Sequence, residues 1–179
     1  MSINIPTSGV HHITLVGSNR DDTIDFYQTV LGMPLLFEQP NLDVPEETHL
    51  YFDAGDGRLI TFFVRENRST DNTPTPESVG AVHHIAYQVS PEVFQRAEEG
   101  LEAAGYPNTG RVDRGFMDSL YFRDPNGFLI ELAFYKFQPR EGQSHVDVLK
   151  AAHQLRLERG EPAIREEHVK EVTAEPART

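Results

Sequence analysis

Two nearly identical tetrapeptides, beginning at positions 11 and 83, constrain this chain most. They are His11-His12-Ile13-Thr14 and His83-His84-Ile85-Ala86, and each follows a Val and precedes alternating apolar residues. A repeat of this kind indicates one structural unit used twice. Neutral imidazole is a ligand for Fe, Zn, Cu or Ni, so the doublets are candidate metal ligands. Because side chains alternate between the faces of a strand, only one histidine of each doublet can point into a shared interior.

Composition and charge narrow the class of protein. The chain has 179 residues, a net charge of −12 and no cysteine. Nucleic acids and anionic membranes are bound through clustered Lys and Arg, so we expect this acidic chain to bind neither. Without cysteine there is no disulfide framework and no thiolate metal site. No signal-peptide pattern and no apolar run of about 18 residues is present. We therefore expect a cytoplasmic protein.

The order of predicted elements is the same in both halves of the chain: strand, helix, three strands. We therefore expect an α+β fold of two tandem βαβββ modules, at 9–66 and 81–137, joined by a linker at 67–80 that is rich in Asn, Ser, Thr and Pro. A C-terminal helical extension, 138–179, follows, and its last part is either a second short helix or a partly disordered tail. Predicted strands are 10–16, 35–39, 49–52, 59–65, 81–89, 109–114, 119–122 and 128–134, and predicted helices 21–31, 92–104 and 145–159.

A carboxylate lies in the last strand of the second module. Aligning the two last strands on Gly57 and Gly127 puts Thr61 opposite Glu131, which stands in the apolar run Phe-Leu-Ile-Glu-Leu-Ala-Phe. A carboxylate buried there has to be paired, protonated or bound to metal. One histidine from each doublet plus Glu131 gives the facial triad of non-haem Fe(II) oxygenases, with three open positions. The alternative is a glutamate at a strand edge that faces water, with solvent-exposed histidines.

The sequence resembles the vicinal oxygen chelate superfamily, which includes glyoxalase I, bleomycin-resistance proteins, fosfomycin-resistance proteins and extradiol dioxygenases. Residues 10–16 and 24–33 look like its opening segment, residues 120–131 resemble the extradiol dioxygenase signature, and the resemblance covers residues 9–137. In this superfamily the ligating histidine directly precedes the alternating strand. The resemblance therefore implies that His12, His84 and Glu131 are the metal ligands.

Within the superfamily, the chain is similar to the hydroquinone-cleaving branch. Where catechol-cleaving enzymes have a histidine upstream of the signature tyrosine, this chain has Arg114, seven residues before Tyr121. Both histidine doublets and a threonine at the position of Thr14 also match that branch. Chains of the branch usually have four modules, whereas this one has two.

The resemblance implies a metal-dependent ring-cleaving dioxygenase that acts with O2 on a hydroquinone- or catechol-like aromatic. Fe(II) is the expected metal, and the same ligand set accepts Mn, Ni, Co or Zn. Ring opening needs proton transfers, for which Tyr121 and His83 are candidates, with His11 close by. Arg114 suits an oxyanion or a substrate carboxylate, because its guanidinium is a planar donor fork. Thr14 joins this candidate catalytic set through the resemblance.

Other interpretations remain open. Tyr121 would also fit a half-buried structural tyrosine, and Arg114 a surface salt bridge with Asp113 or Asp118. A metal-dependent glyoxalase, isomerase or transferase of the same fold would use the metal without O2. A bleomycin-resistance-type binding protein would need no metal at all.

The modular organisation also predicts assembly. One βαβββ module forms a curved half-shell whose apolar concave face must be covered. In four-module relatives, the resemblance implies that the first module supplies one histidine and the last supplies the other histidine and the glutamate. We therefore expect a twofold homodimer in which each metal site takes His12 from one chain and His84 and Glu131 from the other.

Overall fold

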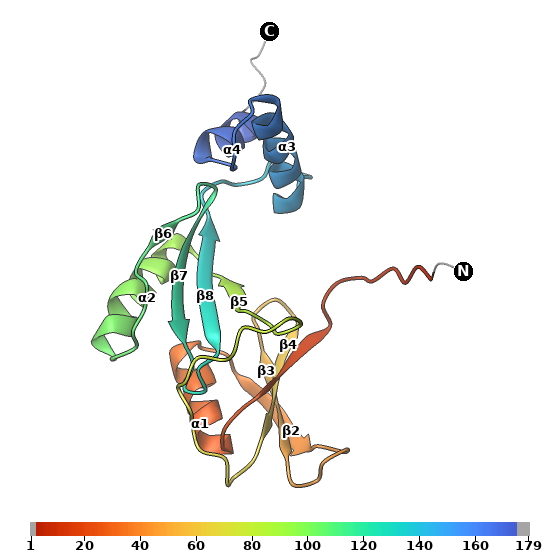
Figure 1. The fold of residues 1–179 in the computed structure, drawn as a ribbon, viewed down its shortest axis with the longest axis vertical. Coiled ribbons are helices and arrows are strands. Elements are labelled where there is room, and N and C mark those ends of the chain that lie inside the picture. The colour runs from red at the N-terminus through yellow and green to blue at the C-terminus, as the bar shows by residue number, and fades with distance from the viewer. Residues whose placement is uncertain (1–2, 175–179) are drawn as a thin grey trace. The chain divides into compact units, whose positions relative to one another are not determined.

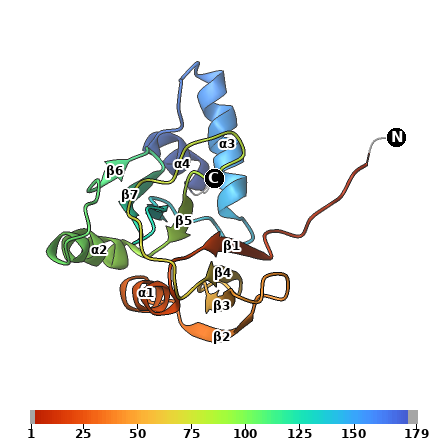
Figure 2. The same ribbon diagram turned by 60° about the horizontal axis from the view of Figure 1, so that its bottom comes forward.

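The computed structural model describes residues 3–174, and these residues form two compact units (Figures 1 and 2). The first unit includes the chain up to Pro76 together with Asp124–Phe128, and the second includes Glu77–Arg123 and the chain from Leu129 onward. Each unit contains one four-stranded sheet and one βαβββ module, so the predicted α+β fold with two tandem modules is confirmed.

The first unit follows the predicted order of elements. Its elements are β1 (His12–Val16), α1 (Arg20–Asp25), η1 (Phe26–Val30), β2 (Leu35–Pro40), β3 (Thr48–Asp53) and β4 (Leu59–Val64). The sheet order is β1-β4-β3-β2, and β1 runs parallel to β4 while the other pairs are antiparallel. The predicted helix 21–31 is only half α-helical: Asn19 caps its start, but Phe26–Val30 forms a π-helical turn.

One face of the first sheet packs on the helix. The fully buried ring of Tyr27 lies 4.4 Å from that of Phe62 and 5.8 Å from that of Phe52, measured between centroids. Because side chains alternate along a strand, the residues between these core positions point to the other face, which we call the open face. His12 and Thr14 of β1 lie on this open face, and the register aligns Thr14 with Thr61.

The second unit repeats the first. Its elements are β5 (Ile85–Gln88), α2 (Pro91–Ala103), β6 (Val112–Asp113), β7 (Met117–Arg123) and β8 (Leu129–Tyr135), in the sheet order β5-β8-β7-β6 with β5 parallel to β8. Ser90 caps α2 by accepting a hydrogen bond from the backbone N–H of Val93, as its sequence position predicted. Phe94 of α2 contacts Phe134, so this helix covers one face of the sheet and leaves an open face.

Two predicted strands of the second module are shorter than expected. The parallel ladder between β5 and β8 begins at the pair Ile85 and Ile130, so residues 81–84 lie outside it. The strand predicted at 109–114 contains only the two residues of β6, although Asn108 makes an isolated bridge with Phe122. His84 therefore precedes its strand directly, whereas His12 is the first residue of its own.

The C-terminal extension is helical. Helix α3 (His145–Glu158) begins with a capping box between Ser144 and Asp147, and α4 (Glu166–Thr173) lies beside it beyond the end of β8 (Figure 1). Phe137, Val148, Ala152 and Val169 form its buried apolar cluster. Of the tail predicted as a short helix or partly disordered, 166–173 is thus helical, while 175–179 lie outside the described residues. Within residues 3–174, no helix is long and apolar enough to cross a membrane.

Candidate metal and substrate site

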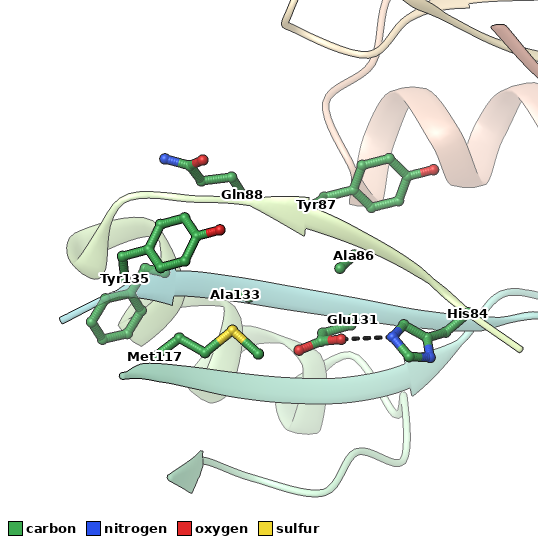
Figure 3. A pocket seen from close by; sticks show the side chains of 9 residues that line it. His84, Ala86, Tyr87, Gln88, Met117, Glu131, Ala133 and Tyr135 are labelled. Atoms are coloured by element: carbon green, nitrogen blue, oxygen red, sulfur yellow. Dashed lines mark ion pairs between the residues drawn. The ribbon is translucent and has the colours of Figure 1, made fainter. Parts of the chain in front are cut away.

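The buried carboxylate of Glu131 is the centre of the site in the second unit (Figure 3). Strand β8 places it on the open face, opposite Ala86 of β5 and Tyr121 of β7. Only 3% of Glu131 is exposed. Its Oε2 lies 2.9 Å from Nε2 of His84, and its Oε1 has no hydrogen-bond partner in the described structure. A buried carboxylate oxygen without a partner is costly, so this atom has room in its bonding for a hydrogen-bond donor or a cation.

A pocket of about 390 Å³ lies against this pair (Figure 3). It is lined by His84, Ala86, Tyr87, Gln88, Met117, Glu131, Ala133, Phe134 and Tyr135. Aromatic and aliphatic side chains with one carboxylate and one imidazole suit a small aromatic ligand with a polar end. Glu131, Ala133 and Tyr135 alternate along β8 and so share the open face.

In each doublet, the first histidine orients the imidazole ring of the second through a hydrogen bond. Nδ1 of His83 lies 2.7 Å from Nδ1 of His84, and Nδ1 of His11 lies 2.8 Å from Nδ1 of His12. One nitrogen of each pair donates a hydrogen bond to the other, so both candidate ligands are held through Nδ1, while Nε2 of His84 faces Glu131. Metal-ligating histidines in proteins have their other ring nitrogen hydrogen-bonded in this manner. His11 and His83 therefore lie where they can position the two candidate ligands.

The two modules differ at one equivalent position. The register pairs Thr14 with Thr61 in the first sheet and Ala86 with Glu131 in the second. In the first module, the Thr61 hydroxyl donates a hydrogen bond to the Thr14 hydroxyl at 2.8 Å. At the same places, the second module has the carboxylate of Glu131 and the methyl group of Ala86. The first module thus offers a histidine without a carboxylate, and the second offers both.

Arg114 and Tyr121 form a pair beside the candidate ligands. The ring of Tyr121 stands edge-on to that of His84, 5.8 Å between centroids. Arg114 Nη2 donates to the Tyr121 hydroxyl at 3.3 Å, and its guanidinium lies 5.5 Å from the ring centroid. The salt bridges proposed as an alternative for Arg114 are not formed within residues 3–174, where Asp113 and Asp118 both pair with Lys136, at 2.7 and 2.9 Å.

The first unit carries further polar groups on its open face. His49 and Tyr51 of β3 lie there, and Tyr51 pairs with Thr61 in the register. Burial, and secondarily the charge of nearby His12, lower the pKa of His49. Neither His49 nor Tyr51 was identified from the sequence, although the alternation 49, 51 in the predicted strand could have placed them on one face. Gln88, Met117 and Tyr135 were also missed, and the last two lie outside the strands predicted at 119–122 and 128–134.

The residues present fit a divalent cation. Glu131 offers a buried oxygen without a partner among the described residues, and His84 offers an imidazole fixed through Nδ1. Among residues 3–174, no group of three or more His, Asp or Glu side chains is arranged to hold a metal ion. His84 and Glu131 are thus a partial ligand set, and the assignment of His12 as the third ligand stays a prediction.

Comparison with known proteins decides the family. Residues 9–132 match the model of the Glyoxalase/Bleomycin resistance protein/Dioxygenase superfamily. The chain belongs to this superfamily. It is 32% identical over 133 residues to the Bacillus subtilis (strain 168) protein named "Putative ring-cleaving dioxygenase MhqO", a match covering 70% of this chain and 40% of that protein. The chain thus spans less than half the length of MhqO.

Transferases of the superfamily are similar at the same level. The metallothiol transferase FosB of Staphylococcus haemolyticus (strain JCSC1435) is 31% identical over 126 residues, which cover 69% of this chain and 81% of FosB. The structure of a mutant of FosX, a fosfomycin resistance protein from Listeria monocytogenes, complexed with Mn(II), aligns with a TM-score of 0.55 at 22% identity. The alignment covers 74% of this chain and 95% of FosX. That likeness concerns the fold.

Proposed function

We propose that this protein is a metal-dependent ring-cleaving dioxygenase that acts on a hydroquinone- or catechol-like aromatic with O2. The observation that carries the proposal is the buried Glu131, bonded to His84 through one oxygen and without a described partner at the other, beside the Arg114–Tyr121 pair. The similarity to MhqO supports the same reaction class. In the overall reaction one aromatic C–C bond breaks, and both atoms of O2 enter the product.

His12, His84 and Glu131 would hold the metal, and Fe(II) is the metal we propose. Two imidazoles and one carboxylate leave positions open for small ligands, the pattern of non-haem iron oxygenases, and the same set accepts Mn, Co, Ni or Zn. Iron bound there would supply the redox chemistry with O2 that side chains lack.

The other side chains bind, orient and move protons. The Tyr121 hydroxyl, polarised by Arg114, can donate a hydrogen bond to an oxygen atom of the substrate or accept one from its hydroxyl group. His83 and His11 share a proton with the adjacent ligand candidates and so fix their orientation. Thr14 presents a hydroxyl on the open face of the first module. The aromatic and aliphatic side chains that line the pocket would contact the aromatic ring of the substrate.

We also propose a homodimer with two shared metal sites. His84 and Glu131 provide two ligands, and the residue of the first module equivalent to His84 is His12. A twofold dimer would bring His12 of one subunit to His84 and Glu131 of the other, twice. Mixing His12→Ala protein with Glu131→Ala protein tests this arrangement, because subunit exchange restores one intact site per heterodimer. If activity does not return after mass spectrometry has demonstrated exchange, each site lies within one chain.

Oxygen uptake tests the reaction. Fe(II)-loaded protein is supplied with a panel of hydroquinones and catechols in an oxygen electrode, with Glu131→Ala protein as the control. We expect uptake of one O2 per ring cleaved, and mass spectrometry after reaction under ¹⁸O2 should find two labelled atoms in the product. Labelled product without ring opening, or no uptake with any member of the panel, would refute the proposal. A FosB-type transferase would instead consume a thiol without O2.

A further inference from the structure

A second polar cluster lies on the open face of the first sheet, and the roles assigned above do not use it. The Tyr51 hydroxyl accepts a hydrogen bond from Gln39 Nε2 at 3.2 Å and shares one with Nδ1 of His49 at 2.8 Å. The three residues come from β2 and β3, where the register pairs Gln39 with His49. They hold the phenolic hydroxyl from two sides and so fix its direction.

His49 has an unused nitrogen. Its Nε2 is buried and has no hydrogen-bond partner in the described part of the chain, while Nδ1 is engaged by Tyr51. Leaving a buried polar atom without a partner costs about 1–3 kcal/mol. Proteins keep such atoms where a ligand or water completes the bond. The ring of His49 lies 4.5 Å from that of Phe63, so the atom stands in a partly aromatic surrounding.

The position of Tyr51 in the first module corresponds to that of Tyr121 in the second. Tyr51 pairs with Thr61, and Tyr121 pairs with Glu131. Thr61 and Glu131 are themselves equivalent, as the two parallel ladders showed. Each module therefore presents a tyrosine at the same place on its open face, beside the last strand of the module. In both modules a nitrogen donor contacts the tyrosine hydroxyl.

An aromatic wall accompanies the cluster. The ring of Phe37 stacks on that of Tyr51, with 4.2 Å between centroids and 19° between planes. Phe37 is 49% exposed, so its other surface is available to a second ring. An exposed phenyl ring beside a fixed hydroxyl and an imidazole matches the two parts of a phenol, which are an apolar ring and a group that both donates and accepts.

We infer that the Tyr51 hydroxyl, oriented by His49 and Gln39, binds the hydroxyl of the aromatic diol that is remote from the metal. The inference rests on the proposed function, because the proposed ligand His12 is what brings the first module to the substrate. The inference also favours one substrate class, the aromatic diols. The second hydroxyl of a diol can form a hydrogen bond with Tyr51, which a simple phenol bound to the metal cannot form. Tyr51 is thus a substrate-binding residue, held in place by His49 and Gln39.

A purely structural role is the competing explanation, since the same hydrogen bonds join β2 to β3. The test removes one hydroxyl from the protein and one from the ligand. Binding of hydroquinone and of phenol to Zn(II)-loaded protein is measured by calorimetry without oxygen, because Zn(II) has no redox chemistry. Wild-type protein is compared with Tyr51→Phe and with Tyr106→Phe, a control that removes a tyrosine hydroxyl outside the cluster.

We expect wild-type protein to bind hydroquinone about tenfold more tightly than phenol, the effect of one additional hydrogen bond. Tyr51→Phe should weaken hydroquinone about tenfold and phenol less than about twofold, whereas Tyr106→Phe should weaken neither. Equal losses for both ligands, or no loss for either, would overturn the inference. His49→Gln provides a second variant, and we expect the same selective loss of hydroquinone.

Turnover separates this inference from the proposed reaction. With Fe(II)-loaded protein, Tyr51→Phe should raise KM for hydroquinone about tenfold and change kcat less. If wild-type protein consumes no O2 but the selective loss of binding is observed, the dioxygenase proposal fails while hydroxyl recognition by Tyr51 stands. If O2 uptake is normal and Tyr51→Phe weakens both ligands equally, only the role of Tyr51 is refuted.

Discussion

Without metal, the Glu131→Gln variant should be more stable than the wild-type protein. With metal, it should be less stable than the wild-type protein. In the metal-free protein, only 3% of Glu131 is exposed, and its Oε1 has no partner among the described residues. Glutamine keeps the shape and can still accept from Nε2 of His84, but it carries no charge. The wild-type carboxylate is paired with His84 through only one of its two oxygens, so replacing it by a neutral amide should stabilise the metal-free protein.

The expected magnitudes are large enough to measure. In Glu131→Gln the amide NH2 takes the place of Oε1 and also lacks a partner, but an unpaired buried group costs more when it is charged, so the variant should add about 1–2 kcal/mol to the free energy of unfolding without metal. For a chain of this size that corresponds to a rise of about 2–8 °C in Tm. Metal at about 100 times its Kd stabilises the wild-type protein by about 2.7 kcal/mol, and the variant should lose most of that gain.

Thermal unfolding with and without Zn(II) or Mn(II) measures both effects, and elemental analysis of the dialysed protein measures bound metal. The matched control is Glu66→Gln, which removes an exposed carboxylate and should change neither quantity. A Glu131→Gln protein that is less stable than wild type without metal would refute the view that the buried charge of Glu131 is only partly compensated by His84. A variant that gains as much from metal as wild type would refute its role as a ligand.

Three further outcomes follow from the same structure. Tyr121→Phe and Arg114→Ala should each lower kcat by about 10²–10³ while bound metal, measured by elemental analysis, stays unchanged. Gly127→Ala should destabilise more than Gly55→Ala in urea unfolding: both have positive φ, which costs about 1–2 kcal/mol, but only at Gly127 would the new Cβ clash with the backbone carbonyl oxygen of Thr73. Burial raises the pKa of Asp124, so the folded protein holds that proton more tightly than the unfolded chain does. Its contribution to stability should therefore fall as pH rises above the ordinary value of 3.8, and the unfolding free energy of wild type minus that of Asp124→Asn should decrease as pH rises from that value toward neutrality.

The fold was predictable because local signals and periodicity agree. Ser90 followed by Pro91 marks the start of α2, and the structure has both residues in those roles. The alternation around the histidine doublets predicts the first strand of each module, and the structure pairs each of them in parallel with the last strand of its module. The π-helical turn at Phe26–Val30 was not predictable, because the apolar residues of this segment also fall on one face when it is drawn as an α-helix. The sequence pattern therefore does not distinguish the two helix types.

The site was predictable only where chemistry leaves a mark in the sequence. Glu131 was identifiable because a carboxylate in an apolar strand is costly unless it has a partner, and the doublets because they repeat. The pocket lining, such as Met117 and Tyr135, has no such mark, since apolar side chains on a strand are common to cores and pockets alike. The hydrogen bond between Arg114 and Tyr121 could not be predicted without the register of β7. Arg114 lies before the turn that leads into β7, and the sequence does not fix the length of that turn.

The difference between Thr61 and Glu131 explains how a duplicated module makes an asymmetric site. If the first module also carried a carboxylate at this position, each histidine would have its own buried anion, and the two ligand sets together would contain two negative charges. With Thr61, the hydroxyl is satisfied by Thr14 inside the first module, at no cost in buried charge. In the second module, the oxygen at this position is the Oε1 of Glu131, which lacks a partner among the described residues. The first module is left free to use its open face, with Tyr51 and His49, for binding the substrate rather than the metal.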